Sequence, residues 1–146
     1  MTLMPDVNIL VYAHRPAAPG HAAYRTWLGR QLEGQEVIAL SVLAAVGFVR
    51  LVTDGRIQQN PTPMAVALAA IDGLARHPRC RVVGPGPGHL EDVARLCRAS
   101  GITGRDVSDA QHAALAIAEG ATWVTRDGGF RRFEPHGLRW QHLVLE

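Results

Sequence analysis

The sequence predicts an α/β domain built around a largely parallel sheet. Short apolar runs rich in β-branched residues alternate along the chain with longer segments whose apolar residues recur at helical spacing. This alternation is typical of βαβ units, in which each helix returns the chain to the start of the next parallel strand. The chain has 146 residues, and no linker, repeat or low-complexity tract divides it. We therefore expect a single domain spanning residues 1–146.

The first half of the chain contains two predicted strands, at residues 2–5 and 36–40, and three predicted helices, at residues 21–33, 42–52 and 63–77. Residues 7–14 fit either a continued strand or a helix, because the apolar pattern alone does not decide. Ser41 is the predicted N-cap of the second helix. Pro63 is the predicted first residue of the third helix, with Thr62 as its cap.

The second half contains three predicted strands, at residues 80–83, 121–125 and 138–144, and two predicted helices, at residues 89–99 and 109–119. The strand at 80–83 is expected to be buried. Residues 84–88 alternate glycine and proline and are interpreted as a connecting loop. Ser108 is the predicted N-cap of the last helix and Gly120 its C-cap.

The type of basic residue in this chain is more informative than the net charge. The net charge of +2 is too small to indicate a nucleic-acid partner, but all 15 basic residues are arginine. The absence of lysine excludes a Walker A nucleotide site and Schiff-base chemistry, because both depend on a lysine amine. Arginine favours bidentate contacts with phosphate groups, so the composition is compatible with an RNA partner.

The sequence also bears on where the protein acts. No apolar run approaches the roughly 20 residues needed to span a bilayer, and no signal-peptide pattern opens the chain. Cys80 and Cys97 fit no metal-site spacing and are interpreted as reduced, buried thiols, with a disulfide as the less favoured alternative. We expect a cytoplasmic protein without membrane contact.

Three aspartates share one kind of context. Asp6 follows the first predicted strand, Asp127 follows the strand at 121–125, and Asp109 opens the last predicted helix. Ligands collect at the carboxyl ends of parallel strands, so these three side chains are expected to converge. Clustered carboxylates suit Mg²⁺ or Mn²⁺, which prefer hard oxygen ligands. Taken alone, these aspartates also have ordinary structural explanations. Asp109 could interact with the dipole at a helix N-terminus, and Asp127 could form a turn.

Four segments of the chain stand out together: residues 6–15 (DVNILVYAHR), 47–53 (GFVRLVT), 109–116 (DAQHAALA) and 125–130 (TRDGGF). In this order and spacing they resemble the PIN-domain ribonucleases, and most closely the VapC toxins of actinobacterial toxin–antitoxin pairs. The resemblance implies a three-layer α/β/α sandwich with a mainly parallel sheet. It also implies that residues 7–13 form a helix.

The resemblance further implies a site in which Asp6, Asp109 and Asp127 hold Mg²⁺ or Mn²⁺. The family's second acid belongs in the helix at 42–52, where it aligns with Ala45 or Gly47, and it is missing in either alignment. This gap favours an alternative function, in which a catalytically silent PIN fold binds RNA or antitoxin without cutting.

Four polar residues are candidates to support the aspartates. Asp106 lies three residues before Asp109 and shares its helical face if the helix starts early; otherwise it is a solvated loop residue. Asn8 and Thr125 are candidate hydrogen-bond partners of the metal-binding carboxylates. Ser41 matches a position near the family's site, although its predicted role as an N-cap already accounts for it.

Arginines are the candidate contacts for RNA phosphates. Arg50, Arg126, Arg131 and Arg132 are the best placed in the sequence, although a solvated or ion-paired role is the default for any one of them. The resemblance implies a metal-dependent endoribonuclease toxin that cleaves RNA such as tRNA or rRNA and inhibits translation. It also implies a homodimer and a cognate VapB-type antitoxin, which binds operator DNA in place of this chain. Tyr24, Trp27 and Leu28 lie on the predicted helix at 21–33 and fit a place in the core. The resemblance implies instead that part of this region meets the antitoxin or a second copy.

Overall fold

The computed structural model describes residues 1–146 and contains one five-stranded parallel sheet. The strands are β1 (Thr2–Pro5), β2 (Val37–Ser41), β3 (Cys80–Val83), β4 (Thr122–Thr125) and β5 (Arg139–His142). They lie in the order β3-β2-β1-β4-β5, and every neighbouring pair is parallel. Strand β1 is central, and the chain moves outward from it first to one edge and then to the other. The predicted parallel α/β sheet is confirmed.

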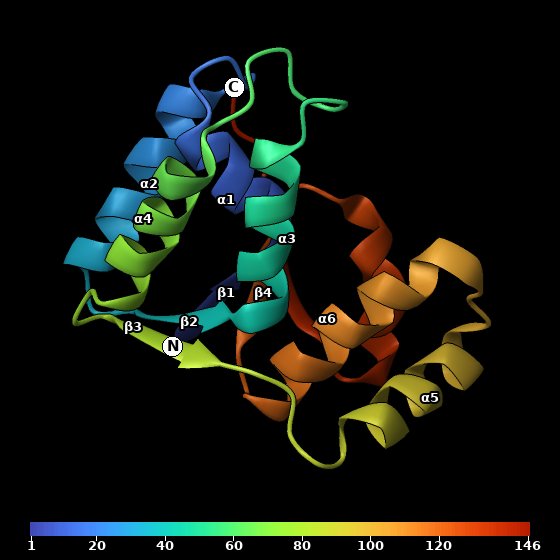
Figure 1. Ribbon diagram of the computed structural model, residues 1–146. Coiled ribbons are helices and arrows are strands. Elements are labelled where there is room, and N and C mark those ends of the chain that lie inside the picture. Colours follow the sequence, from blue (N-terminus) through green and yellow to red (C-terminus); the bar gives the residue numbers. More distant parts are fainter.

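Helices cover both faces of this sheet (Figure 1). They are α1 (Val7–His14), α2 (His21–Glu33), α3 (Val42–Thr53), α4 (Met64–Ala75), α5 (His89–Ser100) and α6 (Val107–Ala118), with 3₁₀ segments η1 (Gly104–Asp106) and η2 (Gly128–His136). Strand β4 shows how the two faces differ, because successive side chains point to opposite sides. Trp123 packs with α6 and η2, whereas Val124 packs with α1 and α2. The three-layer sandwich is therefore confirmed.

Residues 7–14, which the apolar pattern left undecided, form helix α1. The helix begins because the Asp6 carboxylate accepts a hydrogen bond from the Val7 backbone N–H at 2.6 Å. Ile9 and Leu10 on this helix are buried against two parts of the core. The turn at Asp6 thus ends β1 and directs the chain onto one face of the sheet.

Two boundaries in the first half of the chain differ from expectation. Helix α4 begins at Met64, and Pro63 is its N-cap residue, with no side-chain cap. The Thr62 hydroxyl, expected to cap this helix, instead lies 3.2 Å from Arg15 Nη1. Strand β3 was expected to be buried, but it pairs only with β2 at the sheet edge. Its Val82 side chain is 50% exposed for that reason.

The second half differs from expectation in three places. Helix α6 begins at Val107 because the turn η1 leads directly into it, so Ser108 lies in its first turn and is not the cap. The last strand ends at His142, earlier than expected. Between β4 and β5 the chain forms the 3₁₀ segment η2, which no sequence pattern indicated. The early start of α6 brings Asp106 to the helix that carries Asp109.

None of the helices combines the length and the apolar character that crossing a membrane requires. Cys80 and Cys97 are both free thiols.

Candidate functional site

A cleft of about 710 Å³ opens at the carboxyl edge of the sheet, and Asp6, Asp109 and Asp127 all line it. Strands β1 and β4 lie side by side here. The chain leaves β1 toward α1 on one face and leaves β4 toward η2 on the other, which opens a crevice between them. The sheet topology therefore brings the three predicted aspartates to one place.

Asp6 is the most buried of the three aspartates, with 7% of its surface exposed. The Thr125 hydroxyl donates to its Oδ2 at 2.6 Å, and Asn8 Nδ2 donates to the same oxygen at 3.2 Å. The pKa of Asp6 is raised to about 6, chiefly by burial; its hydrogen bonds from Thr125 and Val7 oppose this shift, and the nearby Asp109 and Asp127 carboxylates add to it. Asp6 is thus a desolvated carboxylate in a field of like charge.

Asn8 and Thr125 connect Asp6 to Asp127. The Thr125 hydroxyl also accepts a hydrogen bond from the Asp127 backbone N–H at 3.0 Å. Asn8 Oδ1 accepts from the Arg126 backbone N–H at 3.2 Å, which ties α1 to the end of β4. These bonds fix the relative positions of the strand ends that carry the two carboxylates.

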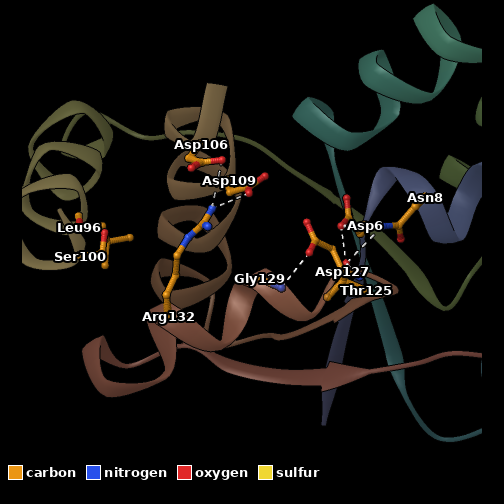
Figure 2. Close-up of polar contacts among 10 residues, drawn as sticks. All are labelled: Asp6, Asn8, Leu96, Ser100, Asp106, Asp109, Thr125, Asp127, Gly129 and Arg132. Carbon is orange, nitrogen blue, oxygen red and sulfur yellow. Dashed lines mark hydrogen bonds and ion pairs between the residues drawn. The ribbon is translucent and has the colours of Figure 1, made fainter. Parts of the chain in front are cut away.

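The other two aspartates come from different elements, Asp127 from the start of η2 and Asp109 from the first turn of α6 (Figure 2). Asp127 caps this segment, and its Oδ1 accepts from the Gly129 backbone N–H at 2.8 Å. Asp109 Oδ2 lies 2.7 Å from Arg132 Nη2, and the same nitrogen lies 3.8 Å from Asp106 Oδ1. Burial raises the pKa of Asp109; Arg132 opposes this shift, whereas Asp127 and Asp106 add to it.

The donor chemistry of the cleft fits a divalent cation. Its three carboxylates offer hard oxygen atoms, and their mutual repulsion is relieved only by protons or a cation. No three His, Cys, Asp or Glu side chains lie close enough to share an ion as the side chains stand. Asp109 is instead neutralised by Arg132. Binding an ion here therefore requires the carboxylates to move together.

The structure distinguishes the two positions where an additional acid was missing. Ala45 is buried in the core beside Leu10 and Phe48. Gly47 lines the cleft with the aspartates. A Cβ atom at Gly47 would lie 3.0 Å from Val7 Cγ2, because α3 approaches α1 closely there. Of these two positions only Gly47 faces the cleft, and a side chain there would crowd Val7.

The arginine candidates occupy different places. Arg50 lines the cleft. The Arg126 guanidinium lies 4.1 Å from the centre of the Tyr12 ring and donates from Nε to Tyr24 Oη at 2.8 Å. The Arg131 guanidinium lies 5.8 Å from the centre of the Trp140 ring. Neither Arg126 nor Arg131 lines the cleft, and their contact with RNA phosphates stays a prediction.

Ser41 caps α3, as its sequence position indicated. Its Oγ accepts hydrogen bonds from the backbone N–H groups of Leu43 and Ala44 at 3.1 and 3.3 Å. Its hydroxyl makes no hydrogen bond to the cleft carboxylates. The cap therefore accounts for this buried serine, and a role of Ser41 in supporting the metal-binding residues stays a prediction.

His112 is a cleft residue that the sequence analysis missed. It lies one helical turn after Asp109, is 8% exposed and stacks on Trp123 with ring centres 5.1 Å apart. Burial lowers the pKa of His112 to about 4, so the imidazole is neutral at physiological pH. The spacing Asp109-x-x-His112 was the available signal, since residues three apart share a helix face.

Comparison with known proteins places this architecture in a family. The PIN domain matches residues 3–134. The chain belongs to the PIN-domain family. VapC ribonuclease Mb2897 from Mycobacterium bovis is 39% identical over 140 residues, which cover 96% of this chain and 94% of that protein. Ribonuclease VapC31 from Mycobacterium tuberculosis is 34% identical over 128 residues, covering 88% and 90%. These relatives place this PIN domain among the VapC ribonucleases.

Solved structures share the fold at lower identity. The VapBC2 complex from Rickettsia felis, bound to a DNA fragment from its promoter, includes a chain with a TM-score of 0.69 and 22% identity, covering 97% of this chain and 98% of that one. VapBC-1 from nontypeable Haemophilus influenzae gives a TM-score of 0.64 at 21% identity, covering 97% of each chain. At these identities the likeness concerns the fold alone.

Proposed function

We propose that this PIN domain is a Mg²⁺- or Mn²⁺-dependent endoribonuclease that acts as the toxin of a toxin–antitoxin pair. The observation that carries the proposal is the convergence of Asp6, Asp109 and Asp127 on one cleft from β1, α6 and β4. Membership of the VapC ribonucleases supports the choice of RNA as substrate. RNA cleavage by such a site is hydrolysis of a phosphodiester bond.

In this mechanism Asp6, Asp109 and Asp127 would hold the ion, which would supply water activation and charge stabilisation at the phosphate. Thr125 and Asn8 orient the Asp6 carboxylate through the hydrogen bonds described above. Only Oδ1 of Asp127 is hydrogen-bonded, to Gly129, so its Oδ2 is free to accept a proton from the attacking water. Arg50 offers its guanidinium to a phosphate in the same cleft.

The proposed partners follow from the relatives and from the surface. We infer that tRNA or rRNA is the substrate and that the cytoplasm is the site of action. A VapB-type antitoxin neutralises the chain and binds the operator DNA, and the toxin is a homodimer. An apolar hollow of about 300 Å³ between α1, α2, α3 and α4, lined by residues such as Leu28, Ile71 and Leu74, offers a surface for a partner segment. The Tyr24 side chain, by contrast, is part of the core.

A second candidate function is a PIN fold that binds RNA or antitoxin without cleavage. Two observations favour it: Gly47 stands where an additional acid would face the cleft, and Arg132 neutralises Asp109. Both would weaken the hold on a cation. This candidate predicts RNA binding with no products.

The test is RNA cleavage by the purified chain, freed of antitoxin, with total RNA and with tRNA. We expect discrete products with Mg²⁺ or Mn²⁺, and none with EDTA or with Asp6→Ala or Asp109→Ala. Asp72→Ala is the matched control, because Asp72 forms only an exposed ion pair with Arg76 on α4. Folded wild-type protein that binds RNA but yields no products would refute the nuclease and support the silent module.

A further inference from the structure

Arg132 is joined to both acidic residues at the start of α6. Its Nη2 atom lies 2.7 Å from Asp109 Oδ2 and 3.8 Å from Asp106 Oδ1, and Figure 2 shows its side chain extending from η2 toward both carboxylates. No other arginine is ion-paired with an aspartate that lines the cleft. Arg132 is thus paired with one of the carboxylates that the proposed function assigns to a divalent ion.

This ion pair differs from a mobile surface salt bridge. The Arg132 side chain is 30% exposed, and its guanidinium lies 5.1 Å from the centre of the fully buried Phe133 ring. Its Nε atom is buried without a hydrogen-bond partner. The protein therefore holds this guanidinium in a partly desolvated position in which the Asp106 and Asp109 carboxylates are its main polar partners. A charge held this way affects its neighbours more strongly than a solvated one.

Asp106 does not line the cleft, whereas Asp109 does. Asp106 is also the more exposed of the two, with side-chain exposures of 47% and 28%. Asp106 therefore contacts the guanidinium without lining the cleft. The Asp109 carboxylate contacts Arg132 and also lines the cleft. The two aspartates therefore have different surroundings although they are only three positions apart in the chain.

We propose that Arg132 is a positioning residue that competes with the divalent cation for Asp109, and that Asp106 acts by anchoring Arg132 and is not a metal ligand. This inference rests on the proposed function. A guanidinium beside Asp109 removes much of the negative potential that would attract a cation. The site is consequently weaker for metal than its carboxylates alone would make it, and metal binding requires Asp109 to exchange its partner.

The first test is Mn²⁺ affinity without RNA, measured by calorimetry at a pH where the carboxylates are ionised. Arg132→Gln should bind Mn²⁺ roughly tenfold more tightly than wild type, as expected for removing one nearby partly desolvated charge. Arg132→Lys, which keeps the charge, should stay near the wild-type affinity. Arg131→Gln is the matched control, because it removes the same charge from the adjacent residue, which faces Trp140, and it should also stay near wild type.

The second test combines two variants to distinguish whether Asp106 anchors Arg132 or binds the ion. In the Arg132→Gln background, adding Asp106→Asn should change Mn²⁺ affinity by less than about threefold, because the arginine through which Asp106 acts is gone. A fall of tenfold or more in that background would show that Asp106 holds the ion. That result would overturn the assignment of Asp106.

Equal Mn²⁺ affinity for wild type and Arg132→Gln would overturn the proposed competition between Arg132 and the cation for Asp109, provided that circular dichroism shows both proteins to be folded. Weaker binding by Arg132→Gln would overturn it as well. Failure of the proposed function gives a different result, because Mn²⁺ would then bind to none of the proteins and EDTA-sensitive cleavage would be absent.

Discussion

Replacing Asp6 with asparagine should stabilise the metal-free protein at neutral pH. Asp6 is 7% exposed, and burial raises its pKa from 3.8 to about 6. For an acid with a raised folded-state pKa, ionisation disfavours the fold. The penalty is absent below the unfolded pKa, grows through the interval between the two values, and is complete above about pH 6. Asparagine keeps the shape of the side chain and the cap of α1 but carries no charge.

The size of this effect follows from the shift. A difference of about two pKa units corresponds to about 3 kcal/mol at pH 7.5 and to about 1 kcal/mol at pH 4.5. In the wild type, Thr125 and Asn8 both donate hydrogen bonds to Asp6 Oδ2. The amide nitrogen of the substituted asparagine is itself a donor and cannot accept these hydrogen bonds. This mismatch subtracts about 1 kcal/mol. The net expectation is a gain of about 2 kcal/mol near pH 7.5, or a rise in Tm of about 4–8 °C.

The assay is thermal and urea unfolding of wild type and Asp6→Asn in EDTA at both pH values. Asp72→Asn is the control, because it makes the same chemical change at an exposed ion pair and should shift stability by less than about 0.5 kcal/mol. Adding Mg²⁺ should raise the Tm of wild type more than that of the variant. A variant that is no more stable than wild type near pH 7.5, or whose gain does not shrink near pH 4.5, would refute the reasoning.

Three further outcomes are expected. Thr125→Val removes the 2.6 Å hydrogen bond to Asp6, so the pKa of Asp6 should rise further and the pH–rate profile of RNA cleavage should shift to higher pH; an unchanged profile would contradict this. Arg50→Gln should raise KM for RNA about tenfold with little change in Mn²⁺ affinity, and an equal loss of both would show that Arg50 acts on the fold. The double variant Val7→Ala/Gly47→Glu should tighten Mn²⁺ binding about tenfold, as measured by calorimetry. Gly47→Glu alone should lower the stability of the fold, as measured by unfolding, because its Cβ would lie 3.0 Å from Val7 Cγ2.

Local sequence signals were enough to predict the sheet and the positions of Asp6 and Asp127. Each aspartate follows a short apolar run, and parallel strands bring their carboxyl ends to the same edge. The helix after Asp6 could not be derived from periodicity, because its eight residues are apolar on more than one face. Its start depends on the carboxylate cap at Asp6. Boundary errors at Thr62 and Ser108 have the same origin, because several adjacent residues are suitable caps and tertiary contacts select among them.

The roles of the arginines could not be predicted from sequence, because they depend on contacts between distant residues. Arg126 packs on Tyr12 and Tyr24, which lie more than 100 positions away in the chain. Arg132 meets Asp109 only because η2 folds back against α6, and η2 contains glycines and a proline that predict no regular helix. The environment of a charged side chain is therefore the part of this site that required the structure.

The most direct test of the account is the position of Mn²⁺ in crystals of the chain, located by its anomalous scattering. We expect one anomalous peak in the cleft, bound by carboxylate oxygens of Asp6, Asp109 and Asp127, with the Asp109–Arg132 contact lengthened. A peak at another place on the protein, or none in the cleft under conditions that support RNA cleavage, would contradict the assignment of these aspartates as the metal-binding residues.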